Sequence, residues 1–173
     1  IMNREQQKAV GLVELLVTLT LLAVLMAIAA PSFSSHMQRT QQATHVNELL
    51  TALHFSRAEA VTRRTTVSLC EGIDDCGTRR WKNQLIIFAD HNHNGRVDEG
   101  EPILRTLRVA PAYSWNWSNF RAQNHISFKS NGMTHSLNGT FTLCREAIAV
   151  RSVVVNVAGR TRLATPSDNT KCE

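Results

Sequence analysis

The pattern of apolar and polar positions divides the chain into an apolar N-terminal part and a mixed remainder. Residues 1–9 are polar, with Arg4 and Lys8 as the basic positions. Residues 10–30 are almost wholly apolar, which matches the roughly 20 residues that a helix needs to cross a bilayer. Because basic residues precede this stretch and none lies inside it, we expect a cytoplasmic N-terminus and an exported remainder. The pattern therefore predicts a transmembrane helix over 10–30.

A helical periodicity returns in the second stretch, residues 31–64. Its apolar positions recur near the i, i+3, i+4, i+7 spacing of one helix face, at Val46, Leu49, Leu50, Leu53 and Val61. We therefore expect one long helix from about Leu12 to about Thr62, whose second half is amphipathic. The apolar face of that half needs a sheet to cover it.

The third stretch, residues 65–173, contains short runs rich in β-branched and aromatic residues, separated by Asn-Gly turn signals. Strands are expected at 65–70, 84–89, 103–109, 125–130, 140–144 and 150–157, and residues 151–164 read as a strand, a glycine turn and a second short strand. A helix followed by strands, without βαβ alternation, predicts an α+β fold: a long N-terminal helix packed against an antiparallel β-sheet head. We expect at least one of Trp81, Trp115 and Trp117 to lie in its core.

Length and charge limit the number of domains and the possible partners only slightly. The 173 residues suit one domain plus an anchor, and the net charge of +5 favours an anionic partner, although many soluble proteins carry such a charge without one. Residues 102–145 include Arg105, Arg108, Arg121 and Lys129 without a single acidic residue. No nucleophile, zinc-protease or phosphate-loop motif is present, so we expect no enzymatic activity and no cofactor.

Four cysteines allow three disulfide pairings or, as a rival, a zinc site. Cys70 and Cys76 are too widely spaced for a C-x2-C zinc knuckle, and no matching second pair exists. Export would place the head in an oxidising compartment, where disulfides persist. We therefore expect Cys70–Cys76 and Cys144–Cys172, the pairings that close loops locally.

Residues 90–101 fit the calcium-loop pattern D-x-[DN]-x-[DN]-G-x5-E, with Gly95 at the sharp turn. The oxygen ligands would come from the Arg96 carbonyl and from the side chains of Asp90, Asn92, Asn94, Asp98 and Glu101. The alternative is a polar hairpin loop in which Asn and Asp side chains cap their own backbone. The residues before the loop read as a strand, so no EF-hand helix is expected to flank it.

Glu14 lies inside the apolar run, where an ionisable group needs a partner or a place near the membrane surface. Ala9 followed by Val10-Gly11-Leu12-Val13-Glu14 resembles the class III signal of type IV prepilins. The resemblance implies a leader over 1–9, cut by prepilin peptidase between Ala9 and Val10, and N-methylation of the new N-terminus. It also implies that Glu14 pairs with the terminal amine of a neighbouring subunit. Ala9 stands where the family usually has Gly, and Val10 where it usually has Phe.

A second resemblance is carried by the segments 53–63, 86–90, the Asn-Gly loop, 126–132 and the tail Gly159-Arg160-x-Arg162. These segments resemble the FimT/GspH family of type IV pilin-like proteins, and most of all its FimT members. The resemblance implies a single-pass inner-membrane protein with a periplasmic, β-rich head over 65–173, which assembles with other pilin subunits into a pilus filament or its tip.

For the basic tail, the resemblance implies contact with the phosphate backbone of extracellular DNA, without sequence reading, during natural transformation. Arg160 and Arg162 are two positions apart, so on an extended chain they point the same way and can grip phosphates. Gly159 supplies the turn, and the weaker candidates are Arg145, Arg151 and Lys171. Two alternatives remain in which these arginines are only solvated: a structural minor pilin that primes pilus assembly, and the H pseudopilin of a type II secretion system.

Overall fold

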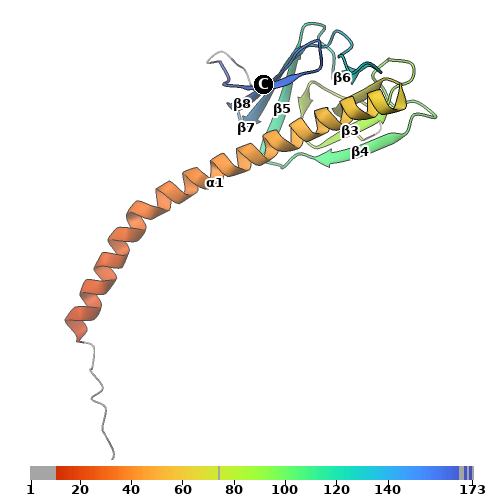
Figure 1. Ribbon diagram of the computed structural model, residues 1–173. Helices are drawn as coiled ribbons and strands as arrows, with labels where there is room; N and C mark the ends of the chain where they lie inside the picture. The colour runs from red at the N-terminus through yellow and green to blue at the C-terminus, as the bar shows by residue number, and fades with distance from the viewer. Residues whose placement is uncertain (1–10, 74, 168–169, 171, 173) are drawn as a thin grey trace, which may run out of the picture. The chain divides into compact units, whose positions relative to one another are not determined.

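The computed structural model describes residues 11–73, 75–167, 170 and 172 (Figure 1). The predictions for Ala9, Val10 and Lys171 concern residues outside these ranges. The chain divides into two compact units, Ile1–Gln41 and Gln42–Glu173, and we call the second unit the head. One helix, α1 (Leu12–Arg63), contributes to both units, and its bounds confirm the expected helix.

In the first unit, α1 exposes its large apolar side chains. Every side chain from Leu12 to Ile28 is exposed, and Glu14 lies in the first turn. The hydroxyls of Thr18 and Thr20 donate to the Leu15 and Val17 carbonyls at 2.9 Å, so their polar groups are satisfied within the helix. Among the residues described, α1 is the one helix long and apolar enough to cross a membrane. This surface suits lipid, where exposed apolar side chains cost nothing.

In the head, the same helix buries one face. The buried positions follow the helical repeat at Val46, Leu49, Leu53, Ser56 and Ala60. Leu50 is partly buried against this core, but the expectation for Val61 is wrong, because its side chain remains 47% exposed. The buried stripe continues through Ala60, one position earlier, and Val61 therefore lies at its border.

The head contains two antiparallel sheets. The first has the strand order β4-β3-β1-β6, formed by β1 (Val67–Glu71), β3 (Gln84–Ala89), β4 (Ile103–Arg108) and β6 (His125–Phe128). The second has the order β2-β5-β7-β8-β9, formed by β2 (Arg80–Trp81), β5 (Tyr113–Asn119), β7 (Gly139–Arg145), β8 (Ile148–Val155) and β9 (Thr161–Ala164). Side chains of α1 and of both sheets share one hydrophobic core, with Trp81, Trp115 and Trp117 all buried in it.

The expected α+β fold with a long helix against antiparallel strands is confirmed, with its strands in two sheets. Six expected strands and the short strand after the glycine turn are present, within a few residues of their expected bounds. β5 and the two-residue β2 were not expected. Both disulfides are confirmed: Cys70–Cys76 closes the connection after β1, and Cys144–Cys172 ties the C-terminal segment to β7.

Candidate nucleic-acid interface

The turn that joins β8 to β9 presents the basic tail. The side-chain oxygen of Asn156 accepts a hydrogen bond from the Arg160 amide at 2.9 Å, and the Arg160 carbonyl accepts one from the Asn156 amide at 3.1 Å. The Gly159 amide donates to the Asn156 carbonyl at 2.9 Å. One asparagine therefore closes the turn and fixes the backbone directly before Arg160.

Gly159 is required at this turn for two reasons. Its φ of +73° lies in the left-handed region, which side chains other than glycine rarely adopt. A Cβ atom would also lie 2.4 Å from the Gly132 carbonyl oxygen, so a side chain has no room. From α1, the Arg57 guanidinium donates to the Gly159 carbonyl at 3.3 Å. The turn is thus held between α1 and the Gly132 turn that follows β6.

The two tail arginines are exposed and carry free charges. Neither Arg160 nor Arg162 forms an ion pair or a side-chain hydrogen bond with any described residue. Between them, the Thr161 hydroxyl lies 3.5 Å from Nε2 of His54 on α1. Since side chains alternate along a strand, Arg162 lies on the face of the second sheet that faces away from α1.

A polar groove of about 510 Å³ runs along that outer face, beside β9. Hydroxyl side chains line much of it, including Thr140, Thr142, Ser152 and Thr165. Serine and threonine hydroxyls are common phosphate and sugar contacts in nucleic-acid complexes. Arg162 lies opposite Val154, a lining residue of this groove, so its guanidinium lies beside the groove, in which Thr140 and Thr165 offer accessible hydroxyls.

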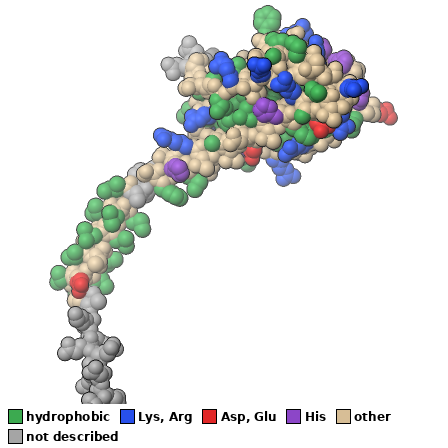
Figure 2. Space-filling model, in the orientation of Figure 1, with side chains coloured by type: hydrophobic (Ala, Val, Ile, Leu, Met, Phe, Trp, Pro, Cys, Tyr) green, Lys and Arg blue, Asp and Glu red, His purple; other side chains and the backbone are tan. Residues whose placement is uncertain are grey.

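The other expected tail residues lie on neighbouring strands. Arg151 on β8 is exposed and donates from Nη1 to its neighbour's carbonyl, that of Val150, at 2.9 Å. Arg145 ends β7 and is half-exposed. Arg151 lies opposite Leu143 and Arg145 opposite Tyr113, both residues of the core, so these two arginines lie on the core-facing side of the second sheet and not on the outer face with Arg162. Figure 2 shows Lys and Arg side chains spread over the visible face of the head, with few acidic ones.

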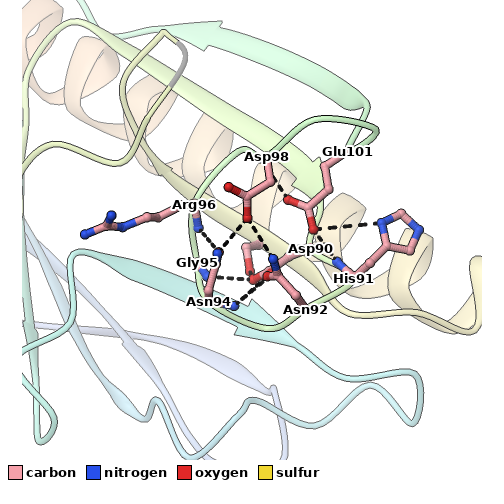
Figure 3. A network of polar contacts seen from close by, with 9 residues as sticks. Asp90, His91, Asn92, Asn94, Gly95, Arg96, Asp98 and Glu101 are labelled. Atoms are coloured by element: carbon pink, nitrogen blue, oxygen red, sulfur yellow. Dashed lines mark hydrogen bonds and ion pairs between the residues drawn. The ribbon is translucent and has the colours of Figure 1, made fainter.

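The expected calcium loop forms a network of its own between β3 and β4 (Figure 3). Asp90 is fully buried, and its carboxylate accepts hydrogen bonds from the Asn94 and Gly95 amides at 3.0 Å and from the Ser68 hydroxyl at 2.5 Å. Glu101 accepts from the His91 amide at 2.7 Å. The two acidic residues at the ends of the loop therefore hold its backbone.

The middle of the loop is closed by amide side chains. Asp98 accepts hydrogen bonds from the side chains of Asn92 and Asn94 at 2.7 and 2.6 Å, and these bonds hold the pKa of its carboxyl below the usual value. The structure thus brings the five expected ligand side chains together, but their oxygens accept hydrogen bonds within the loop. In residues 11–73, 75–167, 170 and 172, no group of three or more His, Cys, Asp or Glu side chains has metal-binding geometry. Calcium binding stays a prediction.

Comparison with known families gives two matches. The family described as "Type II transport protein GspH" matches residues 45–159, and the prokaryotic N-terminal methylation motif matches residues 4–30. The GspH match ends at Gly159, so Arg160 and Arg162 lie just beyond it. A comparison with curated proteins gives no significant match.

Among solved structures, the fold is similar to that of the type IV minor pilin FimU of Pseudomonas aeruginosa in two crystal forms. The first match has a TM-score of 0.55 and 23% identity, and covers 70% of this chain and 91% of FimU. The second has a TM-score of 0.57 and 23% identity, and covers 73% and 90%. At this identity the likeness concerns the fold.

The fold and the N-terminal motif define the class as type IV pilin-like. Within that class the chain belongs to the GspH family, whose match spans well over half of it. Membership implies that its partners are other pilin subunits, and the methylation motif implies processing by prepilin peptidase. This family is structural and not one of enzymes, and the apolar helix fits a membrane-anchored pilin.

Proposed function

We propose that the protein is a minor pilin of a type IV pilus that binds extracellular DNA through the β8–β9 turn and β9 during natural transformation. It binds the phosphate backbone without reading sequence, and a retracting pilus carries the DNA inward. In this scheme the head is periplasmic and the anchor spans the inner membrane before assembly. The observation that carries the proposal is the pair of exposed, unpaired arginines, Arg160 and Arg162, on a turn whose backbone is fixed.

Two physical features favour a phosphate ligand. A guanidinium presents a planar fork of donors that matches phosphate oxygens, and two such groups, one at the end of the turn and one on β9, can contact neighbouring phosphates. The fixed turn at Gly159 and the disulfide that ties Cys172 to β7 reduce the conformational entropy that binding would otherwise cost. Few contacts per head imply weak binding, which several copies in one filament raise through avidity.

A second candidate function follows from the family match. That match ends at Gly159 and includes neither of the two arginines. A structural role, as a minor pilin that primes assembly or as the H pseudopilin of a type II secretion system, would use the same anchor and core. The two candidates differ in what happens to DNA when the tail arginines are removed.

The experiment measures binding of a short DNA duplex by the full chain in neutral detergent, for the wild type and for Arg160→Ala/Arg162→Ala. The expected loss is about 100-fold, from about 1.5 kcal/mol for each of two charge-assisted contacts. A matched control, Arg79→Ala/Arg108→Ala, removes the same charge from exposed positions elsewhere on the head and should change affinity far less. Equal losses in the two double variants, or no binding by the wild type, would favour the structural role.

A further inference from the structure

A pocket rich in histidine lies outside the β8–β9 turn. Its volume is about 170 Å³, and its lining includes His93, Asn94, Arg121, His125 and His135. Four parts of the chain build it: the loop over 90–101, the connection between β5 and β6, β6 itself and the segment that follows β6. Figure 2 shows several His side chains gathered at one end of the head, among Lys and Arg side chains.

The loop over 90–101 places His93 at this pocket. His93 has a left-handed φ of 64°, an uncommon conformation for a residue with a side chain. It is held there because the next two amides, those of Asn94 and Gly95, donate to the buried Asp90 carboxylate. Such strained positions, held by the surrounding structure, occur preferentially at functional sites. The resulting distance between the His93 and His135 ring centres is 5.7 Å.

The other three parts are equally well fixed. Asn119 closes the β5–β6 connection by accepting from the Gln123 amide at 3.0 Å and donating to the Gln123 carbonyl at 2.8 Å, which leaves Arg121 exposed at the tip. The His135 amide donates to the Ser127 carbonyl of β6 at 3.0 Å. The His125 ring lies against Gly95, where a Cβ atom would come within 2.1 Å of it. The pocket is therefore formed before any ligand arrives.

The charges around the pocket are positive. Burial is the main reason that the pKa of His135 is lowered, and the cations Lys129, His93 and Arg121 lower it further. Burial is also the main reason that the pKa of His125 is lowered. The carboxylate of Asp90 raises this pKa, and His135 lowers it. None of the described residues that line the pocket is acidic. A formed pocket whose described lining has one guanidinium, three imidazoles and no acid favours an anion.

We propose that this pocket binds a phosphate group, with the Arg121 guanidinium and the imidazole N–H groups of His93 and His135 as donors. Its size suits one tetrahedral oxyanion, and the arginine fork suits phosphate oxygens. The phosphate group is either part of the DNA backbone or a free phosphate ion. In the first case the inference rests on the proposed function. The site links to the tail through Thr134, whose amide donates to the Val157 carbonyl at 2.9 Å, three residues before Arg160.

Phosphate binding at this site depends on the protonation of His135. A neutral imidazole offers one N–H and no charge, whereas the protonated ring offers two N–H donors and a positive charge. Because cationic neighbours and burial oppose protonation of His135, the ring is mostly neutral above its ordinary pKa of 6.5. The negative charge of a bound phosphate favours the protonated ring. The affinity for phosphate should therefore rise as the pH falls through the range in which His135 titrates.

The first experimental arm uses inorganic phosphate as the probe, with the full chain in neutral detergent and a chelator present. Imidazole NMR signals are followed at about pH 5 and about pH 8, the limits of the range in which histidine titrates. We expect saturable shifts of the His93 and His135 signals at the lower pH, with affinity at least about tenfold weaker at the higher pH. Shifts that do not saturate, or that chloride at equal ionic strength reproduces, would overturn the proposal.

Substitutions in the pocket test which side chains bind phosphate. His93→Gln/His135→Gln and, separately, Arg121→Gln should abolish the saturable response, as followed by calorimetry. His91→Gln is the matched control, because His91 belongs to the same loop but does not line the pocket. Arg121 is exposed, so Arg121→Gln should keep the wild-type melting temperature, which makes it the deciding variant. A response that survives Arg121→Gln, or that His91→Gln also removes, contradicts the assignment.

The second arm uses the DNA duplex and separates the two sources of phosphate. If the pocket contacts DNA, Arg160→Ala/Arg162→Ala should retain weak binding that strengthens at about pH 5, and adding His93→Gln/His135→Gln should remove it. No DNA binding by the wild type at either pH, with phosphate binding intact, would overturn the proposed function and support a site for free phosphate. If the pH dependence of DNA binding is the same with and without His93→Gln/His135→Gln, the pocket does not contact DNA, and the DNA form of the inference is overturned.

Discussion

The loop over 90–101 and the β8–β9 turn are both polar connections of the head, yet they use their charges in opposite ways. In the loop, Asp90, Asp98 and Glu101 direct their carboxylates inward, to amides of the same loop. In the turn, one neutral residue, Asn156, satisfies the backbone, and the charges of Arg160 and Arg162 remain in solvent.

The difference shows how a charged sequence motif acquires a role. Carboxylates that accept hydrogen bonds from their own backbone stabilise and position a loop, and they are less available to a ligand. Cations that the fold leaves unpaired contribute little to stability and are available to a partner. By this reasoning the loop positions His93, and the turn offers binding groups.

Removal of the buried carboxylate should have the largest effect on stability. Asp90→Ala leaves the Gly95 amide without its acceptor and removes one of two partners from the Asn94 amide and from the Ser68 hydroxyl, which should lower the free energy of unfolding by about 3 kcal/mol. Asp98→Ala, at an exposed position of the same loop, should change it little. Urea unfolding of the two variants and of Arg160→Ala/Arg162→Ala checks this. Similar losses in all three would remove the contrast between loop and turn.

Glycine replacements test how tightly each connection is packed. Gly159→Ala meets the Gly132 carbonyl at 2.4 Å and has a φ of +73°, so it should destabilise the head by about 2 kcal/mol. Gly100→Ala, in the loop, has a φ of +85° but nothing within 4 Å, so it should cost only the backbone strain, about 1 kcal/mol. The measurement is thermal unfolding. A smaller cost for Gly159→Ala than for Gly100→Ala would show that the tail turn is not held against its neighbours.

Acid should weaken the head through its half-buried histidines. Burial lowers the pKa of His125 and of His135 from 6.5, so folding favours the neutral rings. Their contribution to stability is full above the unfolded pKa of about 6.5 and is lost as the pH falls through the lowered folded pKa. Melting temperatures should therefore fall on acidification, less steeply in His125→Gln. Added phosphate should offset the fall if the pocket binds it, and a flat profile would contradict these pKa directions.

The smallest expected effect is that of calcium on the loop. Because Asp90, Asp98 and Glu101 already accept hydrogen bonds from loop groups, a cation would have to displace those donors. We expect the melting temperature to stay constant up to millimolar calcium. A saturable rise, absent in Asp98→Ala, would show that the calcium pattern works as a metal site.

The parts of the fold that follow from local periodicity could be predicted from the sequence. The helix and most strands have clear 3.6-residue or two-residue patterns, and both disulfides close local loops. β5 also alternates, with buried Tyr113, Trp115 and Trp117 between polar residues, but its Ser and Asn residues resemble turn signals. How the strands divide into two sheets depends on pairing between distant segments, which no local pattern encodes.

The candidate sites show the same division. The Gly159-Arg160-x-Arg162 tail and the calcium pattern are contiguous in sequence and could be found there. The burial of Asp90 and the packing of Gly159 against Gly132 come from contacts between distant segments. His93 and His135 are 42 positions apart by their numbers and carry no shared motif, so only the fold brings them together.

The most direct test of DNA binding by the tail is the salt dependence of affinity. For the wild type, the logarithm of the binding constant should fall linearly with the logarithm of salt concentration between about 50 mM and about 200 mM, because each phosphate contact releases counterions. In Arg160→Ala/Arg162→Ala, the slope should be smaller in magnitude by about 2, about 1 for each arginine. An unchanged slope would contradict the account, because the two arginines would then make no phosphate contact.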